Sequence, residues 1–100
     1  MTHDDEADFH RAVRAWLADA FEIVAHEPAL ASGRRPDFIA RTPFESYVLE
    51  VESTGDCVYE AIGQAGTYSV ETGYEPVVVY PAHDAPDADL FPGWVTVVMV

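Results

Sequence analysis

Hydrophobic residues recur at helical spacing in two stretches of the chain. Between about Asp5 and Ala20 they fall three or four residues apart, and several acids at the start suit the positive end of a helix dipole. A second apolar face runs along residues 58–68, after Asp56 as a candidate N-cap and before Gly73 as a stop signal. The pattern predicts two amphipathic helices, one at the start of the chain and one in its middle.

Other parts of the chain have the patterns of β-strands. Residues 37–41 and 46–52 flank a turn that contains Pro43, and the second stretch alternates between apolar and polar side chains, which predicts a hairpin. Residues 76–80 are apolar without alternation, as in a strand buried on both faces. Residues 94–100 form an apolar run that predicts a closing strand.

Residues 21–27 allow two interpretations. They could extend the first helix, but their β-branched side chains and the following Pro28 also fit a strand, which we favour. The element order is then helix, three strands, helix, strand, before the closing strand. With 100 residues and no internal repeat, this order predicts one α/β domain over residues 1–100, a mixed sheet flanked by two helices.

The balance of charges is unusual. The chain has 18 acidic residues against five arginines, contains no lysine, and carries a formal net charge of −13. Self-repulsion at such a charge is relieved when the screening length falls to about 3 Å at molar salt, so the composition predicts a halophilic source. The alternative is an ordinary acidic protein whose surface binds a basic partner.

The sequence shows no targeting signal. Cys57 is the one cysteine, so it cannot form an intrachain disulfide, and we expect it to be buried near the start of the second helix. The first eight residues are acidic rather than basic, and no apolar run approaches transmembrane length. We therefore expect a cytoplasmic protein with no membrane partner.

The predicted hairpin brings two carboxylates together. If its turn is centred just after Pro43, Ile39 lies opposite Val48 and Asp37 lies opposite Glu50. Opposed carboxylates with Cβ atoms about 5 Å apart repel each other unless a cation lies between them. Mg²⁺ or Mn²⁺ prefers oxygen ligands and meets this requirement, provided that no bulge shifts the register.

Alternation divides the side chains of the hairpin between two faces. We expect one face to pack against the core: Phe38, Ala40, Tyr47, Leu49 and Val51. We expect the other face to display charge: Arg35, Asp37, Arg41, Glu50 and Glu52. Acids on a strand surface are also expected by chance in so acidic a chain, so a plain solvated surface is the alternative to a site.

These residues resemble a known family. The Pro-Asp37 pair, followed by Glu50-Val-Glu52, is similar to the P-D…(D/E)-x-K signature of the PD-(D/E)XK nuclease superfamily. Gln64 lies in a helix similar to the Gln-containing helix that follows this signature in several branches. The resemblance covers most of residues 5–80, and it implies a single minimal domain with a restriction-endonuclease-like αβββαβ core.

The resemblance also implies a metal site. Asp37 and Glu50 would hold Mg²⁺ or Mn²⁺, with the Val51 carbonyl as a further ligand and Glu6 as a contribution from the first helix. Glu52 stands where the pattern has lysine, and we expect it to position or deprotonate the attacking water. Some restriction enzymes of the superfamily carry glutamate there and remain active, whereas other members with a degraded motif are inactive scaffolds.

Further residues complete the expected site. The resemblance adds Gln64 to the catalytic set, although Gln64 and Tyr68 could instead form a polar edge and a core contact one helical turn apart. Arg34, Arg35 and Arg41 hold most of the positive charge of the chain near the paired acids, which favours nucleic-acid binding through phosphate. Solvated surface charge is the alternative for these arginines.

The predicted function is a Mg²⁺-dependent DNA nuclease, a phosphodiesterase in which metal-bound water attacks phosphorus. A net charge of −13 should repel DNA, so the arginines and the metal must offset that repulsion. The alternative function is a non-catalytic scaffold of the same fold, forming a homodimer through residues 94–100. An apolar closing strand must either be buried internally or pair with another copy.

Overall fold

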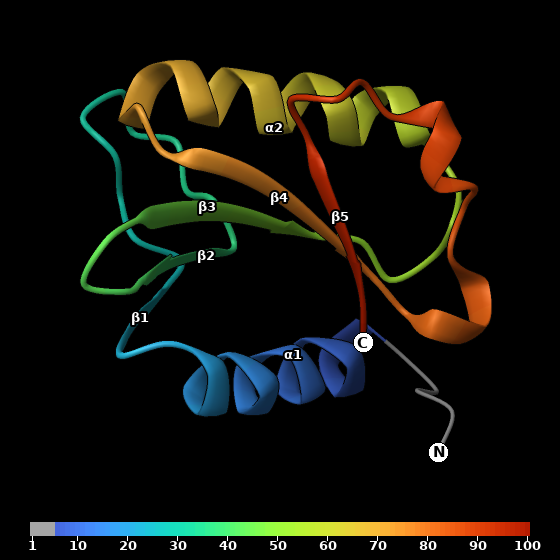
Figure 1. The fold of residues 1–100 in the computed structure, drawn as a ribbon, viewed down its shortest axis with the longest axis horizontal. Coiled ribbons are helices and arrows are strands. Elements are labelled where there is room, and N and C mark those ends of the chain that lie inside the picture. The colour runs from blue at the N-terminus through green and yellow to red at the C-terminus, as the bar shows by residue number, and fades with distance from the viewer. Residues whose placement is uncertain (1–5) are drawn as a thin grey trace.

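A five-stranded sheet lies between two helices, one on each face (Figure 1). The computed structural model describes residues 6–100, except for the side chain of Ile23, so Asp5 lies outside the described residues. Helix α1 covers Glu6–Ala20 and helix α2 covers Val58–Thr72, as the hydrophobic spacing predicts. Within the described part of the chain, neither helix has the length and apolarity needed to span a membrane.

The strands lie side by side in the order in which they occur along the chain. They are β1 Ile23–His26, β2 Phe38–Arg41, β3 Ser46–Val51, β4 Glu75–Tyr80 and β5 Thr96–Met99. The pairs β1–β2 and β2–β3 are antiparallel, whereas β3–β4 and β4–β5 are parallel. The predicted α/β class is confirmed, with a mixed sheet between two helices and the order helix, three strands, helix, strand.

Residues 21–27 contain a strand rather than an extension of α1, as we favoured. β1 pairs with β2 so that His26 lies opposite Phe38. Glu27 then adopts a left-handed conformation with φ of 47°, directly before Pro28, and the strand ends there. Its backbone N–H donates to the Asp37 carbonyl at 2.9 Å, which ties the end of β1 to the start of β2.

α1 and the sheet enclose the first core. Phe9, Val13 and Leu17 of α1 are buried there. They pack with six buried strand residues: Phe38, Ala40, Leu49, Val51, Val77 and Val79. Tyr47 packs against this core at its edge, so the apolar face predicted for the hairpin is the face that α1 covers. Burial of each large apolar side chain contributes about 1.5–3 kcal/mol, and this core therefore anchors the hairpin.

The opposite face of the sheet is not an open charged surface, so that expectation was wrong. α2 packs across β3 and β4, and the small side chains of Ala61 and Ala65 let it approach closely. Val78 and Tyr80 of β4 and Val48 of β3 are buried on this side. A hairpin considered alone leaves this face bare, whereas the helix that connects two parallel strands covers it.

α2 begins at Val58, and Asp56 does not cap it. Cys57 occupies the N-cap position with φ of 56° and makes no side-chain capping bond. The carboxylate of Asp56 instead accepts a 3.5 Å hydrogen bond from the Thr54 hydroxyl, which withdraws it from the helix end. Cys57 is exposed rather than buried. Gly73 ends the helix in a left-handed conformation, as predicted.

The closing strand pairs within its own chain and is only half-buried, with Thr96 and Met99 exposed. A loop with two short 3₁₀-helices, Ala82–Asp84 and Ala88–Leu90, leads to β5, which pairs with β4 at the edge of the sheet. Val97 packs on the α2 side and Val98 on the α1 side. The faces of this apolar run are therefore only partly covered within the chain, and its outer edge has no strand beside it among residues 6–100.

Candidate active site

The site is built on the pairing of β2 with β3. Ile39 lies opposite Val48, as the turn position predicts, and the same register continued by two residues places Asp37 opposite Glu50. Asp37 lies just before β2, and its Oδ2 accepts a 2.7 Å hydrogen bond from the backbone N–H of Val51. The predicted side-by-side position of the two acids follows from this unbulged ladder.

Glu50 is the buried member of the pair. Glu50 is only 8% exposed. Among the described residues, it is the one charged residue that is buried. Its pKa is raised to about 8, chiefly by burial and then by the negative charges of Asp37 and Glu52, while a hydrogen bond from the Asp37 backbone acts in the opposite direction. At neutral pH this carboxyl therefore holds a proton until a positive charge comes close.

The surroundings of Asp37 include groups that raise its pKa and groups that lower it. Burial raises its pKa, and the hydrogen bond from Val51 and the charge of His10 act in the opposite direction. The carboxylates of Glu27 and Glu6 raise the pKa again. Because His10 and Glu6 belong to α1, the start of that helix lies within electrostatic reach of the hairpin acids.

Glu52 joins the same group of acids from the end of β3. Burial is the main cause that raises its pKa, followed by the charges of Asp37, Glu60 and Glu6. Its backbone N–H donates to the Val79 carbonyl at 2.9 Å, which fixes it beside β4. The structure thus brings the predicted Glu6, Asp37, Glu50 and Glu52 into one electrostatic neighbourhood.

The chemistry of this neighbourhood fits a hard divalent cation. Its donors are carboxylate oxygens, and none of Asp37, Glu50 and Glu52 has a salt bridge within 4.0 Å to another described residue. The described residues include no group of three or more His, Cys, Asp and Glu side chains that could hold a metal ion by themselves. Two carboxylates, a backbone oxygen such as that of Val51, water and substrate phosphate would supply the ligands, which is how Mg²⁺ is commonly held.

Gln64 and Tyr68 line a neighbouring pocket on α2. The pocket has a volume of about 520 Å³, and Arg34 and Glu60 also contribute to it. Burial raises the pKa of Tyr68, followed by the charges of Glu50 and Asp37, so the tyrosine lies near the acids. Gln64 is exposed one turn earlier on the same helix, where its amide is free to face a ligand.

The three predicted phosphate-binding arginines do not form one patch. Arg34 lies 3.7 Å from Glu71 in an exposed ion pair, and Arg35 donates to the Glu27 carbonyl at 3.3 Å. Arg41 donates to the Tyr74 hydroxyl at 2.8 Å and covers its ring. Arg41 is four residues from Asp37 along an extended strand, about 13 Å away, so of the three it lies farthest along the strand from the acids.

Two residues near the site were not predicted. His10 lies 3.8 Å from Glu6 on α1 and faces the acids, and the four-residue spacing of this Glu-His pair was the available signal. Tyr80 ends β4 with its hydroxyl fully buried and without a hydrogen-bond partner among the described residues. Its pKa is raised to about 12, chiefly by burial and then by the charges of Glu52 and Cys57. No sequence pattern identifies such a hydroxyl.

Comparisons with known proteins add no assignment: no family model, curated protein or solved structure matches the chain.

Proposed function

We propose that the chain is a Mg²⁺- or Mn²⁺-dependent DNA nuclease with a restriction-endonuclease-like core. The observation that supports this most is the placement of Asp37 opposite Glu50, at the end of a hairpin and against a core. A buried acid beside a half-buried one, with no basic partner, is costly, and a structural role alone gives no reason to keep the two side by side. A divalent cation relieves that cost and supplies the usual metal chemistry, an activated water and neutralised phosphate charge.

Each residue of the proposed site then has a defined role. Asp37 and Glu50 would hold the ion, and the Val51 N–H keeps the Asp37 carboxylate oriented. Glu52 accepts a proton from the attacking water, for which its raised pKa makes it a stronger base than an ordinary glutamate. Glu6 would add a further acid from α1, and the exposed Gln64 of α2 would donate to substrate.

DNA binding must overcome the net charge of −13. Molar salt shortens the range of that repulsion to about 3 Å, but it also weakens the gain from counterion release. Binding at high salt therefore depends on short-range contacts near the metal, such as Arg34 in the pocket with Gln64.

The test is DNA cleavage by wild type and three single variants, on single-stranded, double-stranded and branched DNA across Mg²⁺, Mn²⁺ and KCl series. We expect Glu52→Gln and Asp37→Asn to lose most of the cleavage, roughly 100-fold or more, because one removes the base and the other a metal ligand. Glu22→Gln is the control, since this exposed acid lies beside Arg41 at the other end of the hairpin. If wild type cleaves no faster than Glu52→Gln on every substrate, the nuclease proposal fails.

The second candidate is a non-catalytic homodimeric scaffold. It is favoured by β5, which lies at the edge of the sheet and leaves Met99 57% exposed. A second copy pairing along this edge would cover both the strand and that side chain. Light scattering would show a dimer that Val98→Pro returns to a monomer, and a monomeric wild type across micromolar concentrations would exclude this candidate.

A further inference from the structure

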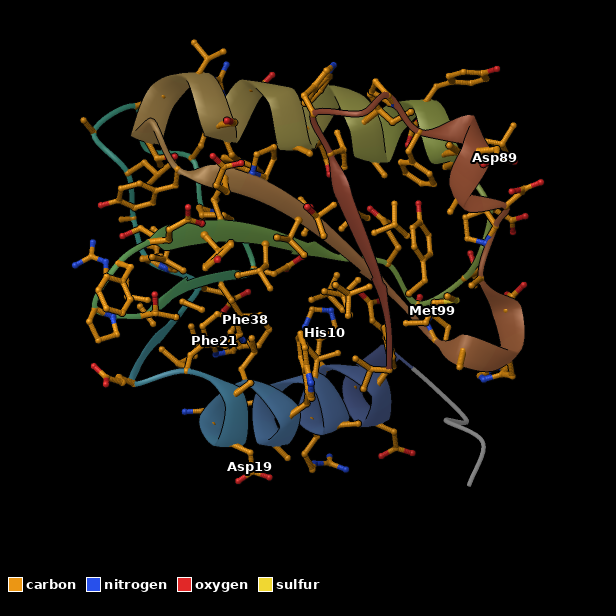
Figure 2. All side chains as sticks on the ribbon, viewed as in Figure 1. His10, Asp19, Phe21, Phe38, Asp89 and Met99 are labelled. Carbon is orange, nitrogen blue, oxygen red and sulfur yellow. The ribbon has the colours of Figure 1, made fainter. Side chains whose placement is uncertain are left out.

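A hollow on the surface opens between the first half of α1 and the end of β1. Its volume is about 670 Å³, within the range of small-ligand sites. Phe38 closes its floor, and the rings of His26 and His10 lie 5.0 Å and 6.4 Å from the Phe38 ring. Both imidazoles are tilted by about 30° to that ring. Figure 2 shows His10 rising from α1 toward the sheet on the side where Phe38 lies.

Positive charge borders this ring-lined hollow. Arg11 and Arg14 line it, which are two of the five basic side chains in the chain. Arg11 is bound to Asp8 at 2.7 Å, one turn away on the same helix. Arg14 is exposed and has no ion pair with another residue in the range 6–100. A guanidinium in this state is available for an anion.

The ring-lined hollow adjoins the candidate active site. Glu6, His10 and Glu27 all line it, and the charges of all three act on the Asp37 carboxylate. The backbone of Glu27 also binds the Asp37 carbonyl at 2.9 Å. A ligand that fills the hollow would therefore lie next to whatever the acids hold.

We propose that the ring-lined hollow binds an unpaired base of single-stranded DNA, with the phosphate of that nucleotide on Arg14 and the next phosphate at the acids. The inference rests on the proposed nuclease function and specifies its substrate as a single strand or a frayed end. A base in a duplex is stacked and paired, so it cannot enter a pocket between a helix and a strand without leaving the helix.

Aromatic stacking also suits the charge of this chain. Phosphate contacts lose their value as salt rises, whereas stacking of a base on an aromatic ring is not ionic and persists at molar salt. Because both imidazoles already contact the Phe38 ring, part of the cost of ordering them is met before a ligand binds. This surface gives an acidic protein a means of binding DNA where electrostatics cannot.

The experiment measures binding of a labelled single-stranded thymidine oligomer by fluorescence anisotropy in molar KCl. Ca²⁺ replaces Mg²⁺ and Mn²⁺, so that binding is measured without cleavage. Arms with the same oligomer made abasic and with a blunt duplex separate base stacking from backbone binding. We expect His26→Ala and Arg14→Gln each to weaken binding of the thymidine oligomer roughly tenfold, and His26→Phe to restore it. The abasic oligomer and the duplex should bind weakly to all proteins.

Tyr59→Ala is the matched control, because this ring is 83% exposed on α2 and lies outside the hollow. His26 is itself exposed, and circular dichroism checks that each variant is folded. Unchanged binding in His26→Ala and Arg14→Gln, equal binding of the abasic oligomer, or no binding of the thymidine oligomer by wild type would each overturn the subsite.

The nuclease proposal is judged separately, from cleavage rates in Mg²⁺ or Mn²⁺ over a range of DNA concentrations that reaches saturation. Binding that depends on His26 without any cleavage supports the subsite and refutes the nuclease. Cleavage that is unaffected in KM by His26→Ala and Arg14→Gln supports the nuclease and refutes the subsite. The two proposals can thus fail independently.

Discussion

The Asp37 carboxylate accepts a 2.7 Å hydrogen bond from the backbone N–H of Val51, which joins the start of β2 to the end of β3. Val51 directly follows Glu50, so the bond fixes the position of one acid relative to the backbone of the other. The sheet itself therefore places the Asp37 carboxylate next to the backbone that carries Glu50, before any ion binds.

The pH dependence of stability should depend on Glu50. Its pKa in the folded protein is about 8, above the ordinary 4.5, so between these values the folded state holds a proton that the unfolded state has lost. Its stabilising contribution is complete below about pH 4.5 and is lost as pH rises through 8. We expect wild-type stability to fall by up to about 1.4 kcal/mol per pH unit in this window, and Glu50→Gln to flatten the slope. Urea unfolding at constant salt and a series of pH values measures this free energy of unfolding. Parallel plots of stability against pH for wild type and Glu50→Gln would contradict the raised pKa of Glu50.

Tyr80→Phe should leave the protein as stable as wild type or make it more stable, by up to about 1 kcal/mol. The mutation removes a buried hydroxyl that has no partner among the described residues, and burial of an unsatisfied polar group is unfavourable. Tyr74→Phe is the comparison, because its hydroxyl accepts a bond from Arg41 and its loss should lower stability. A clear loss of stability in Tyr80→Phe would show that a water or another group satisfies this hydroxyl.

Two glycines should respond oppositely to alanine. At Gly55 a Cβ atom would lie 2.7 Å from the Asp84 carbonyl oxygen, so the loop after Glu52 must shift, and we expect a loss of about 1–3 kcal/mol. At Gly63, within α2, a Cβ atom would meet nothing within 4 Å, and alanine should gain about 0.5–1 kcal/mol from its helix propensity. Thermal unfolding of wild type and both variants measures these changes in stability. A Gly55→Ala protein as stable as wild type would mean that the loop does not pack on Asp84.

The sequence predicts the hairpin well because its side chains alternate and its turn contains proline. The alternation determines which face of the sheet packs against α1, and the turn position determines that Ile39 lies opposite Val48. Both are local properties of neighbouring residues, so no long-range information is needed.

Other features depend on contacts that are distant in the sequence. Burial of Glu50 requires α2 to cross the sheet above it, and a hairpin alone does not show this crossing. Likewise, His10 reaches Asp37 only when α1 packs beneath β2. The start of α2 was predicted too early because the side chain of Asp56 binds Thr54 instead of the helix end.

Salt should stabilise the protein strongly. At a net charge of −13, repulsion among surface acids opposes the compact state, and exposed ion pairs such as Arg11–Asp8 offset little of it. We expect the melting temperature to rise steeply from low to molar KCl as the screening length falls to about 3 Å. A melting temperature that stays constant across this range would remove the argument for a halophilic source.

The central claim is that Asp37 and Glu50 share one divalent cation, and calorimetric titration with Mn²⁺ and Mg²⁺ tests it most directly. The proteins are wild type, Asp37→Asn and Asp19→Asn, the last changing an exposed acid at the far end of α1 that points away from the sheet (Figure 2). We predict one site in wild type and in Asp19→Asn that is lost in Asp37→Asn, because asparagine removes the charge that the ion neutralises. Equal binding by wild type and Asp37→Asn would contradict the claim.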